Sequence, residues 1–127
     1  RQMCIRDRLL IAPDGTVSFF KTADNLPLGV TSDYEYEEQE CYFAPGSQLL
    51  FYTDGVSEAQ NEQSKFYKID RLFNLVVSHS QLAPRQMVDK VVGDVKRFVG
   101  KAEQSDDLTV MSFRLNPRGK KKIEGLL

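Results

Sequence analysis

The chain has 127 residues and a formal net charge of −1, with 41% hydrophobic and 10% aromatic residues. This length allows one domain at most, or part of one, and the apolar content is sufficient to fill a core. The near-neutral charge gives no general attraction to nucleic acid, so no nucleic-acid partner is expected. No apolar run approaches the roughly 20 residues that span a bilayer, so we expect no membrane segment and predict a cytoplasmic location.

The first eight residues, Arg-Gln-Met-Cys-Ile-Arg-Asp-Arg, resemble the translated end of a transposase-type sequencing adapter. We interpret residues 1–8 as an adapter-derived artefact, which would make the chain a piece of a longer protein truncated at its N-terminus. The alternative is an ordinary N-terminal strand, because Ile5 and Leu9 are apolar.

Two apolar segments, residues 9–12 and 17–20, flank the turn residues Pro13-Asp14-Gly15 and predict a β-hairpin. Residues 21–32 contain Pro27 and Gly29 and are predicted to form a loop. Residues 34–43 alternate in polarity and predict an extended strand with one solvated, glutamate-rich face.

After the turn at Pro45-Gly46, residues 48–53 are mostly apolar or aromatic and predict a buried strand. A polar loop is expected from residue 57 to residue 65. Apolar residues at helical spacing then predict two amphipathic helices, the second starting near Pro84 and ending near Gly100. Residues 108–115 predict a last strand, and residues 116–127 a basic tail. The grouping of strands and helices is typical of an α+β fold with helices packed on a sheet.

Asp54 and Asp106 each lie where an apolar strand meets a loop. If the last strand pairs antiparallel beside the buried strand, the two aspartates fall on the same rim of the sheet. Carboxylates without a nearby histidine or thiolate suit hard cations, Mg²⁺ or Mn²⁺, and two such ions form a known hydrolytic device. The residues alone also fit turn and capping roles for these aspartates, and two carboxylates cannot fill two octahedral shells.

The other candidate groups support no separate chemistry. His79 is the only histidine and is predicted to lie at the polar end of a helix, so we expect a surface role. Without a histidine base, Ser57 and Ser105 are not expected to form a nucleophilic triad. Cys4 and Cys41 are too few for a disulfide framework.

The sequence resembles the C-terminal half of the metal-dependent serine/threonine phosphatases, the protein phosphatase 2C-like or PPM class. The likeness is closer to the bacterial branch that contains stage II sporulation protein E (SpoIIE) and the stress-response sigma-regulator phosphatases. It rests most specifically on Tyr-Thr-Asp-Gly-Val-Ser-Glu-Ala at residues 52–59 and on Asp-Asp-Leu-Thr at residues 106–109. Further matching stretches are Pro27-Leu28-Gly29, residues 45–51, Gln60-Asn61 and Arg71-Leu72.

The resemblance covers residues 9–115 and implies the C-terminal part of a PPM fold, an antiparallel β-sandwich flanked by helices with its N-terminal half missing. By this resemblance Asp54 and Asp106 would be metal ligands for two Mg²⁺ or Mn²⁺ ions, with Asp107 beside them. Gly55 would let its backbone pass close to the metal site. The implied substrates are phosphoserine or phosphothreonine proteins, in this branch often anti-anti-sigma-type regulators.

Two family features have no match in this chain: an acidic ligand in an early strand, and an Asp-x-x-Gly-His-Gly-like loop. We therefore expect an enzymatic parent protein and an inactive chain. The alternative is a phosphatase-like binding module without catalysis, and a third interpretation is a small structural domain without a site. Retention of both Asp54 and Asp106 favours the enzyme.

Overall fold

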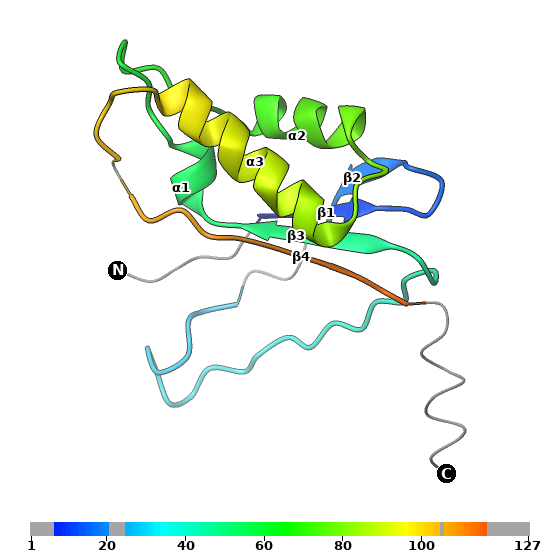
Figure 1. The fold of residues 1–127 in the computed structure, drawn as a ribbon. Coiled ribbons are helices and arrows are strands. Elements are labelled where there is room, and N and C mark those ends of the chain that lie inside the picture. Colours follow the sequence, from blue (N-terminus) through cyan, green and yellow to red (C-terminus); the bar gives the residue numbers. More distant parts are fainter. Residues whose placement is uncertain (1–6, 21–24, 105, 117–127) are drawn as a thin grey trace.

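The computed structural model describes residues 7–20, 25–104 and 106–116. A four-stranded antiparallel sheet has the order β2-β1-β3-β4. Two helices and a single short helical turn lie on one face of this sheet (Figure 1). The elements are β1 (Asp7–Ile11), β2 (Val17–Phe19), β3 (Gln48–Tyr52), α1 (Asp54–Ser57), α2 (Ile69–Ser78), α3 (Pro84–Val99) and β4 (Val110–Arg114). The predicted α+β class is confirmed.

The predicted hairpin is formed by β1 and β2, with Leu9 opposite Phe19 and Ile11 opposite Val17. Its turn is closed by a bond from the Ala12 amide to the Thr16 carbonyl (2.8 Å). Gly15 has φ +91°, a conformation that other residues rarely adopt. The Asp14 carboxylate accepts a bond from the Thr16 amide (2.9 Å), so this aspartate has the turn role expected for an Asp-Gly pair.

The last strand, β4, pairs antiparallel with the buried strand, β3. This pairing was the condition for Asp54 and Asp106 to fall on the same rim of the sheet. Tyr52 lies opposite Val110 and Gln48 opposite Arg114. The end of β3 and the start of β4 therefore lie at the same end of the sheet, next to α1 (Figure 1).

A buried polar side chain connects these two strands at their other end. The amide nitrogen of Gln48 donates to the Ser112 hydroxyl (2.9 Å), and its oxygen accepts from the Arg114 guanidinium (2.9 Å). Arg114 also donates to the carbonyl of Leu82, just before α3 (3.0 Å). Gln48 is only 1% exposed, so its amide needs these partners.

The helices bury one apolar stripe each against the inward-facing residues of β1 and β3. Leu72 and Val76 of α2, and Met87, Val91 and Val95 of α3, are buried together with Leu9, Ile11, Leu50 and Tyr52. The predicted ends of the second helix are confirmed, because α3 begins at Pro84 and Gly100 follows it with φ +62°. Val77 of α2 is apolar but lies outside this stripe and is 47% exposed.

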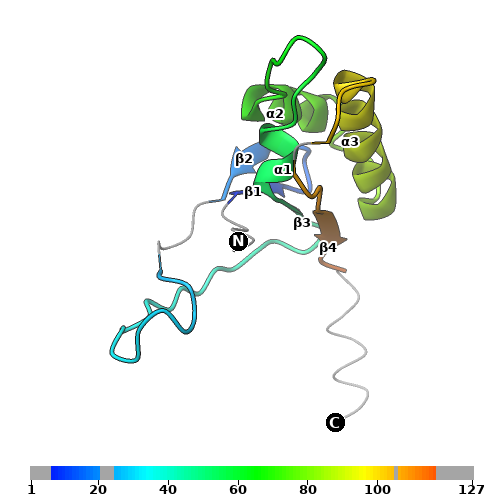
Figure 2. The same ribbon diagram turned by 90° about the vertical axis from the view of Figure 1, so that its left-hand side faces the viewer.

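The predicted strand at residues 34–43 is wrong. These residues run as an irregular, largely exposed segment that extends away from the sheet (Figure 2). Alternating polarity describes a strand only when a neighbouring strand can pair with its backbone. Here the side-chain amide of Asn25 donates to the Glu37 carbonyl and accepts from the Glu37 amide (2.9 Å each). These two bonds connect the irregular segment to the loop that precedes it.

The described residues form one sheet, so the second layer of the expected sandwich is not built within these ranges. Residues 1–8 were interpreted as an adapter-derived segment. Of these, residues 1–6 lie outside the described residues, while Asp7 and Arg8 belong to β1. The basic tail, beyond residue 116, and Ser105 also lie outside them. Within the described ranges no helix is long and apolar enough to cross a membrane.

Candidate metal centre at one end of the sheet

Asp54 lies immediately beyond β3, separated from it by the buried residue Thr53. A polar loop was expected soon after this aspartate, but Asp54 begins the four-residue helix α1. The turn forms because Val56 and Ala59 are buried in the core, which directs the side chain of Asp54 to the exposed side. The amide of Glu58 donates to the Asp54 carbonyl (2.8 Å) and closes the turn.

The segment that carries the second aspartate pairs with this one through Thr53. The Thr53 amide donates to the Thr109 carbonyl, and the Thr109 amide donates to the Thr53 hydroxyl oxygen (3.2 Å each). That hydroxyl in turn donates to the carbonyl of Asp107 (3.3 Å). Thr53 thus extends the β3–β4 pairing and brings the two aspartate-bearing segments side by side.

Gly55 makes the closest approach between the two segments. A Cβ built on Gly55 would lie 2.1 Å from the Asp107 carbonyl oxygen and 3.3 Å from the Cα of Leu108. No side chain larger than hydrogen fits without movement of one backbone. In this structure the backbone of Gly55 passes close to the backbone of Asp107.

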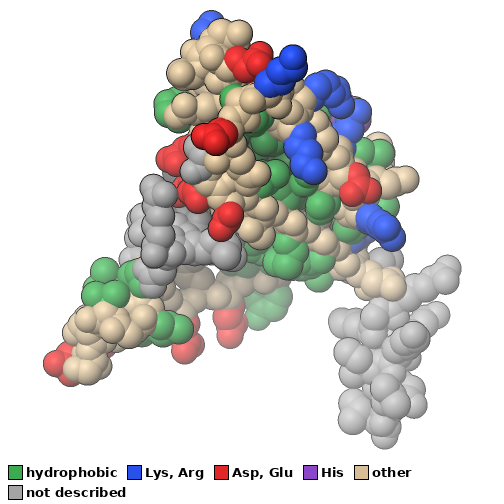
Figure 3. Space-filling model, turned by 60° about the vertical axis from the view of Figure 1, so that its left-hand side comes forward, with side chains coloured by type: hydrophobic (Ala, Val, Ile, Leu, Met, Phe, Trp, Pro, Cys, Tyr) green, Lys and Arg blue, Asp and Glu red, His purple; other side chains and the backbone are tan. Residues whose placement is uncertain are grey.

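Asp106 and Asp107 differ in their surroundings. Asp106 is half-buried, and its carboxylate accepts a bond from the Asp107 amide (2.8 Å), while Asp107 is exposed. Asp106 and Gly55 both line a pocket of about 340 Å³ whose apolar walls include Val95, Val99 and Leu108. On this side of the molecule several Asp and Glu side chains gather, next to a row of Lys and Arg side chains (Figure 3).

The donor chemistry of this end of the sheet fits Mg²⁺ or Mn²⁺, because it offers carboxylate and carbonyl oxygens to a hard cation. In the part of the chain that the structure describes, no three His, Cys, Asp or Glu side chains form a group that could hold a metal ion. A complete octahedral shell therefore needs oxygen ligands beyond Asp54 and Asp106.

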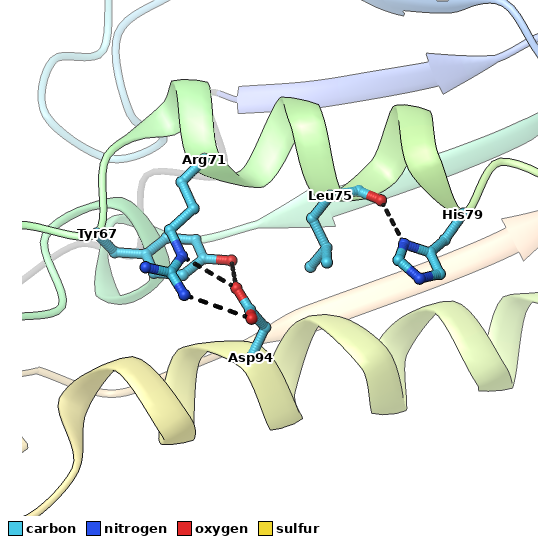
Figure 4. A network of polar contacts seen from close by, with 5 residues as sticks. All are labelled: Tyr67, Arg71, Leu75, His79 and Asp94. Carbon is cyan, nitrogen blue, oxygen red and sulfur yellow. Dashed lines mark hydrogen bonds and ion pairs between the residues drawn. The ribbon is translucent and has the colours of Figure 1, made fainter.

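A second polar cluster, which the sequence analysis did not single out, lies between α2 and α3. The Tyr67 hydroxyl donates to the Asp94 carboxylate (2.6 Å), and the Arg71 Nε donates to the same oxygen (3.2 Å). The Arg71 guanidinium also lies over the rings of Tyr67 (5.1 Å) and Phe98 (4.8 Å). Figure 4 shows Tyr67 and Arg71 converging on Asp94 from the α2 side.

The cluster alters the acidity of its members. Burial would raise the pKa of Asp94, but the hydrogen bonds and positive charge from its partners outweigh this and hold that pKa below its usual range. Burial, followed by the bond to Asp94, raises the pKa of Tyr67 above its ordinary value. At neutral pH the cluster is therefore a neutral phenol and a guanidinium bonded to an ionised carboxylate.

His79 lies at the other end of α2 from this cluster (Figure 4). Its Nδ1 is 2.9 Å from the carbonyl oxygen of Leu75, one turn earlier in the helix. The ring is half-buried rather than fully on the surface.

Comparison with known proteins covers both aspartate-bearing segments. The family described as "Stage II sporulation protein E (SpoIIE)" matches residues 6–116. The chain belongs to the SpoIIE family. A curated relative, the phosphoserine phosphatase RsbU of Bacillus subtilis (strain 168), is 25% identical over 92 residues, which are 72% of this chain and 27% of RsbU.

Solved structures show that this SpoIIE-family chain has part of a PP2C-type phosphatase fold. The SiaA-PP2C domain of Pseudomonas aeruginosa superposes with a TM-score of 0.67 at 22% identity, covering 87% of this chain and 43% of that one. The PP2C phosphatase domain of SpoIIE from Bacillus subtilis, solved with a fragment of its regulatory domain, gives 0.65 at 19% identity, covering 91% and 33%. The chain therefore spans less than half the length of each of these proteins.

Proposed function

We propose that this chain is part of a metal-dependent protein phosphatase that hydrolyses phosphoserine or phosphothreonine on a bacterial signalling regulator. Family membership supports a phosphatase domain, and the similarity to RsbU, a phosphoserine phosphatase, supports the phosphoserine class. An anti-anti-sigma-type regulator as substrate, which the family resemblance implies, and a cytoplasmic location, which was predicted from the sequence, belong to the same proposal.

The observation that carries this proposal is the junction of Thr53, Gly55 and Asp107, because it brings the Asp54 and Asp106 segments together. In the proposal Asp54 and Asp106 are metal ligands, with Asp107 and the Gly55 backbone adjacent. Mg²⁺ or Mn²⁺ at such a site supplies, when bound, an activated water and positive charge against the phosphoryl oxygens.

The residues of this chain supply placement and charge. Thr53 fixes the backbone on both sides of the site through its three hydrogen bonds to Asp107 and Thr109. Gly55 permits the close approach of the two segments, and Asp54 lies on the exposed side of α1, within reach of a cation from solvent. The remaining ligands of a two-ion site would come from another part of the domain.

The test compares this chain with the protein encoded by the intact gene, using a phosphoserine peptide and Mn²⁺. The chain alone is expected to show no turnover above a metal-free control. The intact protein is expected to hydrolyse the peptide, and Asp54→Asn or Asp106→Asn should lower its rate by at least roughly 100-fold. Asp14→Asn is the matched control, because Asp14 serves only the β1–β2 turn and should leave the rate unchanged.

Two results would contradict the proposal. Turnover by the isolated chain would show that this chain already forms a complete site. An intact protein without Mn²⁺-dependent turnover, in a gene that lacks upstream acidic residues, would favour the phosphatase-like binding module instead.

A further inference from the structure

The two segments of the candidate metal centre are both connected to α3. The segment with Asp106 follows the C-terminal end of this helix, after Gly100. The segment with Asp54 shares the apolar core with α3, since Val56, Ala59 and Val95 belong to one buried cluster. Apolar packing of this kind is non-directional, so it leaves the exact position of α1 along α3 to other contacts.

A directional contact between α1 and α3 runs through Tyr67. The Tyr67 amide donates to the Ala59 carbonyl (2.8 Å), and the Lys68 amide donates to the Ser57 carbonyl (3.0 Å). These bonds hold Tyr67 against the residues that end α1. Its hydroxyl donates to Asp94 of α3 (2.6 Å), so a chain of hydrogen bonds joins the end of α1 to this helix.

Asp94 is held in place for this bond. Its side chain is 14% exposed, and Arg71 shares the same carboxylate oxygen with Tyr67 (3.2 Å). The Arg71 guanidinium also lies over the rings of Tyr67 and Phe98, which restricts the Tyr67 side chain. Hydrogen bonds to an ionised group are about twice as strong as neutral ones, so the Tyr67–Asp94 bond is a strong restraint.

The clearance at Gly55 makes this restraint important. The Gly55 and Asp107 backbones are already too close for a Cβ, and a small movement of α1 along α3 would either open this contact or produce a clash. We propose that Asp94, acting through Tyr67, is a positioning residue that sets the place of Asp54 relative to Asp106. The inference rests on the proposed metal centre, because it explains how the two ligands are kept in register.

The test is hydrogen exchange measured by mass spectrometry, on this chain without metal and on the protein encoded by the intact gene with Mn²⁺. The reporters are the amides of Thr53, Val56 and Thr109, which bond across or next to the site. In the metal-free chain, Tyr67→Phe and Asp94→Asn should increase exchange at these amides roughly 10-fold while exchange in β1 stays unchanged. Titration of the intact protein with Mn²⁺ should show at least a roughly 10-fold weaker apparent affinity in both variants.

Two controls separate positioning from general destabilisation. Asp89→Asn removes an exposed charge from the same helix and should behave as the wild-type chain. Val91→Ala removes core volume without touching the cluster, so it should increase exchange in all elements together. Its Mn²⁺ affinity, measured where the variant is folded, should stay within about twofold of wild type.

The inference is overturned if Tyr67→Phe leaves exchange at Thr53, Val56 and Thr109 unchanged, or if the effect of every variant simply follows its global stability. An intact wild-type protein whose amides gain no protection from Mn²⁺ would count against the proposed metal centre. In that case the role of Asp94 in placing α1 is still decided by the metal-free rates.

Discussion

Among the glycines that the structure describes, Gly55 has the least space around its Cα. Its neighbour across the gap is backbone, the carbonyl of Asp107, which cannot rotate away as a flexible side chain could. The residue therefore couples stability to the candidate site: the same contact that packs α1 also sets the separation of the two aspartate-bearing segments.

Gly55→Ala is expected to lower the free energy of unfolding by about 1–3 kcal/mol, because the added methyl group must push two backbones apart. Urea unfolding followed by circular dichroism measures this change. Gly93→Ala is the matched control, since a Cβ at Gly93, within α3, meets no atom within 4 Å. That variant should gain about 0.5–1 kcal/mol from the better helix propensity of alanine. A Gly55→Ala chain as stable as wild type would show that the junction is loose.

At this scale the sequence predicted the positions of interest but not their connection. Asp54 and Asp106 stand out because a charge at the end of an apolar strand needs a partner or solvent. Thr53 was missed, since a threonine at the end of a strand is common and nothing in the sequence reveals its bonds to Asp107 and Thr109. Tyr67 and Asp94, 27 residues apart, were missed for the same reason.

At the level of elements, the Tyr67–Arg71–Asp94 cluster joins α2, α3 and the residues that follow α1. The phenol lies in the interior and next to a carboxylate, so its ionised form would place two negative charges side by side. Burial and the hydrogen bond to Asp94 raise the pKa of Tyr67. The folded chain therefore holds the phenol proton more tightly than the unfolded chain does. The stabilisation is complete below the ordinary tyrosine pKa of 10.0 and is lost as the pH rises above it.

Tyr67→Phe should therefore reduce the loss of stability between about pH 9 and pH 11, because the variant has no buried phenol to ionise. The free energy of unfolding, measured in urea at both pH values, gives this difference for each chain. Tyr42→Phe is the control, since Tyr42 is 94% exposed, and it should show the same pH dependence as wild type. Equal pH dependence in the Tyr67→Phe and wild-type chains would mean that Tyr67 does not titrate differently in the folded state.

The elements that the sequence predicted well are those with a strong internal period. The helices repeat apolar residues every three or four positions, and Pro84 and Gly100 mark the two ends of α3. The strand expected at residues 34–43 failed because a strand is stabilised by its partner, which the sequence pattern does not contain. Residues 34–43 alternate in polarity, but they form an irregular, largely exposed segment in which Tyr42 lies almost entirely in solvent.

For the whole molecule, the most consequential feature is the sheet face opposite the helices. The side chains that alternate with the buried ones along β1, β3 and β4 are largely apolar on this face. Met111 and Phe113 of β4 are 51% and 39% exposed, and Phe113 stacks on Phe51 (5.5 Å). An exposed apolar face bounded by an edge strand is a site for association between chains.

The chain is therefore expected to self-associate, with a sedimentation coefficient that rises with concentration. The double variant Met111→Glu, Phe113→Lys should raise the concentration needed for association by at least roughly 10-fold, because it removes apolar area from the contact. Val77→Lys, on the helical side of the molecule, is the control and should have no such effect. A wild-type chain that sediments as a monomer at all concentrations and melts in one sharp transition would contradict the expectation.

The origin of residues 1–8 stays a prediction. Asp7 and Arg8 pair with Tyr52 and Phe51 in the sheet, and the family match begins at residue 6. Backbone pairing accepts almost any residue at the end of a strand, so the pairing does not decide between an adapter-derived segment and a native strand. The DNA sequence upstream in the source genome would decide it.

The buried side chain of Gln48 has a consequence for how the chain can vary. Sliding β4 by two residues would keep every side chain on its present face, so apolar pattern alone does not forbid it. Such a slip would, however, separate Gln48 from Ser112 and Arg114 and leave its amide unsatisfied inside the protein. The side-chain amide of Gln48 therefore favours a single register between β3 and β4. Insertions or deletions between α3 and β4 must then be absorbed by the connecting segment itself, which is the segment that holds Asp106.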